Sequence, residues 1–371
     1  MAYEGAGVYE DAIKGYLQPI WHLLQDEKVT EVMINGHQEV FIEVDGKLQK
    51  SDSQFVDEDS LRAAITNIAQ SVGRRIDFEN PRLDARLPNG YRIHAVIPPM
   101  CKGTTVAIRK FSSVKLTFKD YIRFGTLSSE TALFLDICMK LGKNILVSGG
   151  TGSGKTTLLS VLCNKIPPGQ RVIVIEDSAE LQIDYEHTVF FETRMADSQG
   201  KGEVTMEDLL KSSLRLRPDR IIVGEVRGAE ALDLIQAMST GHKGCLGTVH
   251  ANSEEDAIVR LEALAQGAEN QLSEKALQYQ IGAAIDLVVQ ISRMADGSRR
   301  ITGISEVLGS NQDGSYNVQS IFKMSRLEKL PNGKIKGALL PQNYIPSFMH
   351  EIEDHRLPFQ RDQFRRRQKA S

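Results

Sequence analysis

The sequence has few cysteines and no pairing pattern among them. Its 371 residues include four cysteines, Cys101, Cys138, Cys163 and Cys245, and no C-x-x-C pair. A zinc site or a disulfide framework is therefore not expected, and reduced thiols in a cytoplasm fit better. No apolar run approaches the roughly 18 residues of a membrane helix, and Met1 to Asp11 has no signal-peptide core. These absences predict a cytoplasmic protein without a membrane span of its own.

A strong charge of one sign is also missing. The chain has 45 Lys and Arg against 48 Asp and Glu, for a net charge of -3. No stable nucleic-acid binding is therefore expected, although a local basic patch is compatible with this balance. The hydrophobic content of 41% and the charged content of 25% are ordinary for a globular protein, and the length suits about two domains.

The pattern of apolar residues divides the chain into two unlike parts. Residues 1–111 mix helical and strand patterns and predict a smaller α+β N-terminal domain. Residues 112–127 are polar and aperiodic, and predict a linker or hinge. Residues 128–371 alternate short apolar strands with helices, which is typical of a doubly wound parallel sheet. We therefore expect an α/β fold with a C-terminal extension.

One glycine-rich stretch dominates the second part. The pattern G-x-x-x-x-G-K-[ST] is filled by Gly149, Gly150, Thr151, Gly152, Ser153, Gly154, Lys155 and Thr156, and Thr157 follows. An apolar run precedes the stretch and a helical pattern follows it, which is the context that a phosphate-binding loop requires. The backbone N–H groups would surround phosphate oxygens, Lys155 would reach the β- and γ-phosphates, and Thr156 would ligate Mg²⁺. A glycine turn that binds nothing would need neither flank, so the stretch predicts binding of ATP with Mg²⁺.

Two further strands end in carboxylates. Ile221 to Val223 is followed by Gly224 and Glu225, and Val174-Ile175 is followed by Glu176 and Asp177. A carboxylate at the carboxyl end of a strand beside the phosphate loop can orient the attacking water. Clustered acids repel one another unless a cation or hydrogen-bond donors lie among them, which predicts a magnesium-side role for Glu176 and Asp177. A surface acid or an exposed acidic turn is the alternative in each case.

Histidines and arginines complete the set of candidates. His242 and His250 lie on either side of a strand that follows Glu225 in the chain. Two histidines alone are more often structural than catalytic, but this position favours sensing of the γ-phosphate or of a neighbouring subunit. Most single arginines are solvated or salt-bridged.

The order of these motifs resembles the secretion ATPase superfamily of type II and type IV secretion, type IV pili and conjugation. The phosphate loop is followed by IEDSAEL, RPDRIIVGEVRG and GHKGCLGTVHANS, which look like the family's Asp box, Walker B and His box. The N-terminal stretches VTEVMING and FENPRLDARLPNGYRIHAVIPP look most like the CpaF-like tight-adherence pilus branch. The four-cysteine zinc insert of type II secretion and pilus-extension relatives is missing, so no metal site is carried over from them.

The resemblance implies a RecA-like ATPase domain behind a smaller N-terminal domain, in a homo-hexamer that docks on inner-membrane platform proteins from the cytoplasm. Its association with the membrane would be peripheral and made through these partners. The residues that would carry the reaction are Lys155, Thr156, Glu225, Glu176, His250 and His242, with Arg194 and Arg215 acting across the subunit boundary. In the N-terminal domain, Arg92 and Arg109 would contact nucleotide.

The function that follows is ATP hydrolysis that powers pilus assembly or protein secretion. A conjugation-type DNA-transfer ATPase or DNA translocase is the alternative, and would show DNA-stimulated hydrolysis and a basic, aromatic-bearing channel. A scaffold that binds ATP without turnover is a third possibility. The complete set of Lys155, Glu176, Glu225 and His250 counts against it.

Overall fold

The computed structural model describes residues 6–44, 46–110, 115–196, 200–268, 272–311 and 313–366. The chain divides into two compact units. One contains the described residues of Met1–Val114 and Ala196–Gly202, and the other those of Lys115–Met195 and Glu203–Ser371. None of the helices that the structure describes has the length and apolarity needed to span a bilayer.

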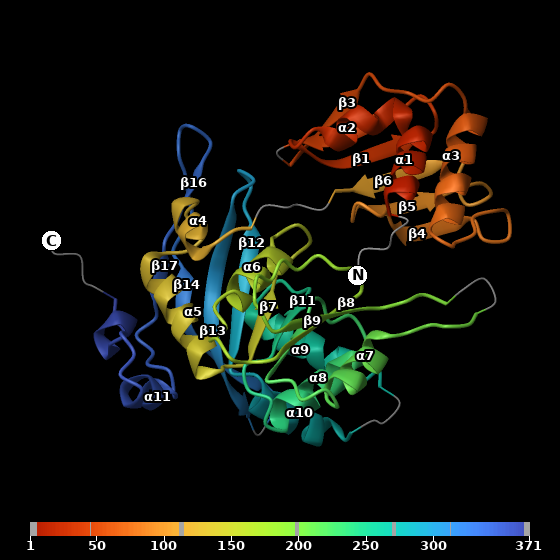
Figure 1. The fold of residues 1–371 in the computed structure, drawn as a ribbon. Helices are drawn as coiled ribbons and strands as arrows, with labels where there is room; N and C mark the ends of the chain where they lie inside the picture. Colours follow the sequence, from red (N-terminus) through yellow and green to blue (C-terminus); the bar gives the residue numbers. More distant parts are fainter. Residues whose placement is uncertain are drawn as a thin grey trace. The chain divides into compact units, whose positions relative to one another are not determined.

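The first unit is an antiparallel sheet covered by helices (Figure 1). Its strand order is β3-β2-β1-β6-β5-β4. The strands are β1 (Val29–Asn35), β2 (Val40–Val44), β3 (Lys47–Ser51), β4 (Arg82–Arg86), β5 (Arg92–Val96) and β6 (Thr105–Arg109), and the helices are α1 (Ala6–Tyr16), α2 (Trp21–Gln25) and α3 (Glu58–Ser71). Alternate residues of the central strands, such as Val32, Ile93 and Ile108, are fully buried with Leu61 and Ile65 of α3. This alternation leaves the other face of the sheet to polar side chains.

The second unit is built on a nine-stranded sheet of order β17-β14-β13-β12-β7-β11-β10-β8-β9. The strands from β12 to β9 in this order are parallel, and β13, β14 and β17 extend the sheet in antiparallel fashion. The strands are β7 (Ile145–Ser148), β8 (Val172–Glu176), β9 (Thr188–Glu192), β10 (Arg220–Val223), β11 (Leu246–Val249), β12 (Leu287–Arg293), β13 (Arg299–Ser310), β14 (Tyr316–Met324) and β17 (Leu339–Pro341), with a separate pair β15 (Glu328–Lys329) and β16 (Ile335–Lys336). The central strands β7, β8, β10 and β11 are buried along their whole length because helices cover both faces of the sheet.

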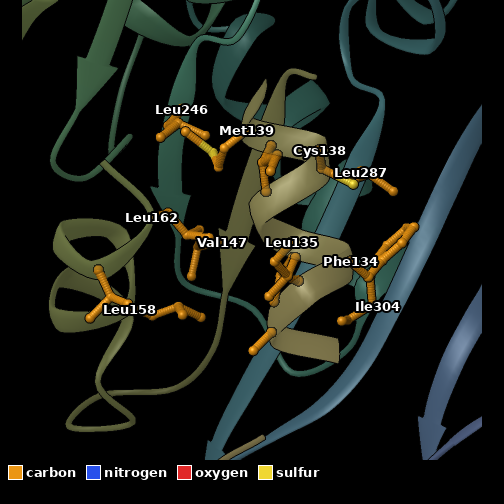
Figure 2. Close-up of a cluster of buried hydrophobic side chains, with 14 of the residues drawn as sticks. Phe134, Leu135, Cys138, Met139, Val147, Leu158, Leu162, Leu246, Leu287 and Ile304 are labelled. Atoms are coloured by element: carbon orange, nitrogen blue, oxygen red, sulfur yellow. The ribbon is translucent and has the colours of Figure 1, made fainter. Parts of the chain in front are cut away.

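Two helical layers enclose this sheet. One face packs against α4 (Phe118–Arg123), α5 (Ser129–Leu141), α6 (Lys155–Cys163) and α11 (Met349–Asp354), and the other against α7 (Met206–Ser213), α8 (Glu230–Ser239), α9 (Glu254–Ala265) and α10 (Glu274–Ala284). Figure 2 shows part of the first layer, where Phe134, Leu135 and Cys138 of α5 lie against β7, β12 and β13. Successive residues of β7 point into opposite layers, since Val147 belongs to one core and Leu146 to the other.

The prediction of a linker over residues 112–127 is wrong for most of its length. Thr117 caps α4, and its hydroxyl accepts a hydrogen bond from the Asp120 N–H. Phe118 and Tyr121 are buried in the core beside α5, together with Leu127. Within α4, Lys119 is exposed while Phe118 and Tyr121 face the core, which makes this short helix amphipathic. Residues 111–114 lie outside the described residues.

Candidate active site

The phosphate loop connects the end of β7 to the start of α6, as the sequence predicts. Gly152 and Gly154 have φ values of 68° and 95°, a conformation that L side chains rarely adopt, and Gly154 is the N-cap of α6. A Cβ at Gly149 would lie 2.3 Å from the carbonyl oxygen of Ile291. Gly149, Gly152 and Gly154 are therefore required by the fold of the loop, which ends at the N-terminus of α6, where backbone N–H groups and the helix dipole favour an anion.

Lys155 lies inside this loop and is 9% exposed. Its Nζ atom donates a hydrogen bond to the carbonyl oxygen of Gly150 at 3.2 Å. Burial lowers the pKa of the ammonium group, and the nearby Glu225 carboxylate opposes that shift. The half-buried Thr156 follows it on the first turn of α6. A buried cation at the start of a helix, inside a glycine loop, is well placed to bind an anion.

Glu176, the last residue of β8, is buried next to the end of the neighbouring strand β10. Its Oε1 atom accepts hydrogen bonds from the backbone N–H groups of Glu180 and Leu181, both at 2.9 Å. Burial raises the pKa of this carboxyl to about 7, against the opposing effect of the two N–H donors. A Cβ at Gly224 would lie 2.9 Å from Glu176 Cγ. Position 224 therefore requires glycine, because the Glu176 side chain fills the space that a larger residue would need.

The raised pKa of Glu176 predicts a pH-dependent stability. The folded-state pKa of about 7 lies above the ordinary value of 4.5, so the folded protein binds more protons than the unfolded chain between these values. The free energy of unfolding therefore falls as pH rises from 4.5 to about 7, by on the order of 3 kcal/mol from this group. Glu176→Gln should lose this slope and exceed the wild type in stability at pH 8.

Urea unfolding of the wild type and Glu176→Gln at pH 5 and pH 8 checks this expectation. Glu186→Gln, which alters an exposed carboxyl in the segment after β8, is the matched control and should follow the wild type. A constant difference between Glu176→Gln and the wild type at both pH values would contradict the assignment.

Glu225 and Asp177 are joined by an arginine that the sequence did not single out. Arg227 Nε donates to Glu225 Oε2 at 2.9 Å, and Arg227 Nη1 donates to Asp177 Oδ2 at 3.3 Å. Val223 pairs with Ile175 between the parallel strands β10 and β8, so the acids that follow these strands lie at the same edge of the sheet. The structure thus brings Glu225 and Asp177 together, with Glu225 near Lys155, and Arg227 fixes the orientation of the two carboxylates.

The two carboxylates expected as magnesium ligands, Glu176 and Asp177, each have other hydrogen-bond partners. Glu176 bonds to two backbone N–H groups and Asp177 to Arg227. Among the residues that the structure describes, no group of three or more His, Cys, Asp or Glu side chains forms a metal cluster. The arrangement instead suits a cation held by few protein oxygens, with Thr156 first among them, since Mg²⁺ usually keeps several waters.

The two histidines lie at opposite ends of β11, His242 before its first residue and His250 after its last. β11 is parallel to β7, and Val249 pairs with Ser148, so the exposed His250 follows β11 at the edge of the phosphate loop. Gln290 Nε2 donates to the Ala251 carbonyl at 3.3 Å and holds this segment against β12. His242 precedes β11, and its Nδ1 lies 3.3 Å from the Ala237 carbonyl at the end of α8. The structure therefore does not bring His242 to the phosphate loop of its own subunit.

The predicted interface arginines also lie away from the loop. Arg194 follows β9 at the far edge of the sheet and forms an antiparallel bridge with Val204. Arg215 is exposed between α7 and β10, at the edge where β10 begins. The action of Arg194 and Arg215 across a subunit boundary stays a prediction.

The first unit places Arg92 and Arg109 side by side. They are paired residues of β5 and β6, and Arg86 of β4 continues the same row. Arg92 Nη2 donates to Asp84 Oδ2 at 3.0 Å, while Arg109 is exposed. The row forms a basic strip on the open face of the sheet. Its use in nucleotide binding stays a prediction.

The chain matches a known protein family over most of its length. Residues 15–324 match the family described as "Type II/IV secretion system protein". The chain belongs to this family. The conjugal transfer protein TrbB of Rhizobium radiobacter is 36% identical over 290 residues, which cover 77% of this chain and 86% of the relative. The type IV secretion system protein PtlH of Bordetella pertussis is 31% identical over 311 residues, which cover 77% and 92%.

A solved structure supports the fold of this family member. The pilus retraction motor PilT with bound ADP matches with a TM-score of 0.56 and 20% identity, covering 92% of this chain and 86% of that one. The predicted α/β fold, a RecA-like ATPase domain with an N-terminal domain, is confirmed. Membership of the type II/IV secretion ATPase superfamily is confirmed as well. The assignment to the CpaF-like branch stays a prediction.

Proposed function

We propose that this type II/IV secretion family member hydrolyses ATP and delivers the resulting domain motion to a pilus-assembly or protein-secretion machine in the inner membrane. One observation carries the proposal. Lys155 is enclosed in the glycine loop, and the Glu225 carboxylate lies near enough to its ammonium group to affect its pKa. A cation for the phosphates and a carboxylate for the water thus lie beyond the carboxyl ends of β7 and β10, the two strands that flank β11 in the sheet.

The chain's residues divide the work of phosphoryl transfer to water. The N–H groups of the loop and Lys155 would bind the β- and γ-phosphates, and Thr156 would hold Mg²⁺, which neutralises phosphate charge when bound. Glu225 would orient the attacking water, and Arg227 would keep that carboxylate in place. His250 follows the strand between β7 and β10 and would report the state of the γ-phosphate. Glu176 would act indirectly, by packing against Gly224 and holding the end of β10 in position.

A homo-hexamer is part of this proposal. Arg194 and Arg215 lie away from the phosphate loop of their own subunit, so they would act on the nucleotide of a neighbour. An arginine supplied from outside a site contributes roughly 10³- to 10⁵-fold in rate. An isolated subunit should then hydrolyse ATP poorly, and activity should depend on assembly.

ATP hydrolysis measured against protein concentration, with the mass determined on the same samples, tests this proposal. Activity per subunit should rise as a ring-sized species appears. Full activity in a monomer would leave an ATPase but would remove the shared site and the roles of Arg194 and Arg215. No phosphate release at any concentration would leave the scaffold that binds ATP without turnover.

Conjugation is the second candidate, because TrbB is named as a conjugal transfer protein. The same assay with and without single-stranded DNA separates the two functions. Hydrolysis that DNA does not stimulate favours protein secretion or pilus assembly, while stimulation by DNA would favour a DNA-transfer ATPase.

A further inference from the structure

A hairpin from the antiparallel part of the sheet lies against the phosphate loop. β12 and β13 form an antiparallel pair in which Leu287 is opposite Glu306 at one end and Arg293 is opposite Arg299 at the other. Two arginines therefore face each other beside the hairpin turn. Asp296 in the turn accepts hydrogen bonds from the N–H groups of Ser298 at 3.0 Å and Ile335 at 2.7 Å. These bonds fix the turn and therefore the position of Arg299.

Arg299 contacts the phosphate loop directly. Its Nε atom donates to the carbonyl oxygen of Gly152 at 3.3 Å. A Cβ at Gly154 would lie 3.2 Å from Arg299 Cδ, so the aliphatic part of the arginine passes over the start of α6. The side chain is nevertheless exposed. Its guanidinium group therefore lies on the solvent side of the loop.

The order of strands shows which end of a bound nucleotide this position would meet. β12 lies on one side of β7, whereas β11, β10 and β8 lie on the other (Figure 1). Glu225 and Asp177 follow β10 and β8, so the γ-phosphate would lie on that side. The α-phosphate and ribose would then leave the loop on the side of β12 and β13.

We propose that Arg299 binds the α-phosphate and ribose end of the nucleotide. This inference rests on the proposed function, since it places the nucleotide by its γ-phosphate. A planar guanidinium group suits phosphate oxygens, and a charged acceptor forms a stronger bond with it than the Gly152 carbonyl does. Arg299 thus extends the site beyond the phosphates that the loop and Lys155 hold.

Calorimetric titration of the full chain with ATP, ADP and pyrophosphate, each with Mg²⁺, tests the inference. Arg299→Ala should weaken ATP and ADP binding by about 10-fold or more, and Arg299→Lys should recover part of this loss. Pyrophosphate, which fills only two phosphate positions, should bind both variants as it binds the wild type. Arg326→Ala, which removes another exposed arginine of the same unit, is the matched control.

The outcomes separate this inference from the proposed function. Equal ATP affinity in Arg299→Ala and the wild type would overturn the inference alone. An equal loss of ATP and pyrophosphate binding would also overturn it, because Arg299 would then only hold the loop in shape. Failure of the wild type to bind ATP or ADP would overturn the proposed function itself.

Discussion

Lys155→Ala should abolish both ATP binding and hydrolysis. Lys155 is the buried cation inside the phosphate loop, and its ammonium group would form charged hydrogen bonds to two phosphates. Each such bond contributes about 1.5–3 kcal/mol, so affinity should fall at least about 100-fold. Titration with ATP and a phosphate-release assay measure the two effects.

The same substitution should leave the fold intact. Burial disfavours the charged form of Lys155, so replacing it with alanine removes a desolvation cost along with one hydrogen bond to a carbonyl. The thermal midpoint without nucleotide should therefore change little. Lys329→Ala, on the exposed strand β15, should match the wild type in every assay. ATP affinity in Lys155→Ala within about threefold of the wild type would refute the assignment of the phosphate site.

The phosphate loop and the acids beside it could be predicted because their signals are local. The glycines at 152 and 154 are needed for left-handed backbone, and that requirement is visible in the motif itself. Glu176 is the last residue of β8 and Glu225 lies two residues beyond β10, and the carboxyl ends of parallel strands meet at one edge of a sheet. Sequence was sufficient here because a short pattern determined the position.

Other positions depend on distant parts of the chain. His242 and His250 flank β11 at its two ends, and only the pairing of β11 with β7 shows that His250 is the one beside the phosphate loop. The polar residues of 112–127 concealed a helix whose burial depends on α5.

Two arginines of the proposed site gave weak signals or none in the sequence. Arg299 reaches Gly152 across 147 positions of the chain, and only the pairing of β12 with β13 places it there. Arg227 was the exception, since it lies two residues beyond Glu225 and could have been suspected from that spacing.

Glu225→Gln should keep nucleotide binding and lose turnover. The amide keeps the size of the side chain but cannot orient and polarise water as a carboxylate does, and groups of this kind contribute about 10²- to 10⁴-fold in rate. The ATP affinity should stay within a few-fold of the wild type, since Lys155 and the loop hold the phosphates. Single-turnover hydrolysis at saturating ATP, with affinity measured on the same preparation, gives both numbers.

Arg227 makes this experiment more specific. Removing the charge of Glu225 leaves Asp177 as the remaining acidic partner of the Arg227 guanidinium group among the hydrogen bonds described, so Arg227→Ala should lower turnover in the wild type and change little in Glu225→Gln. Such non-additivity is expected of residues that act as a unit. Glu255→Gln, on the exposed side of α9, is the matched control and should hydrolyse ATP normally. Normal turnover in Glu225→Gln would transfer the water-orienting role to another carboxylate, and Asp177, held by the same arginine, would be the first to examine.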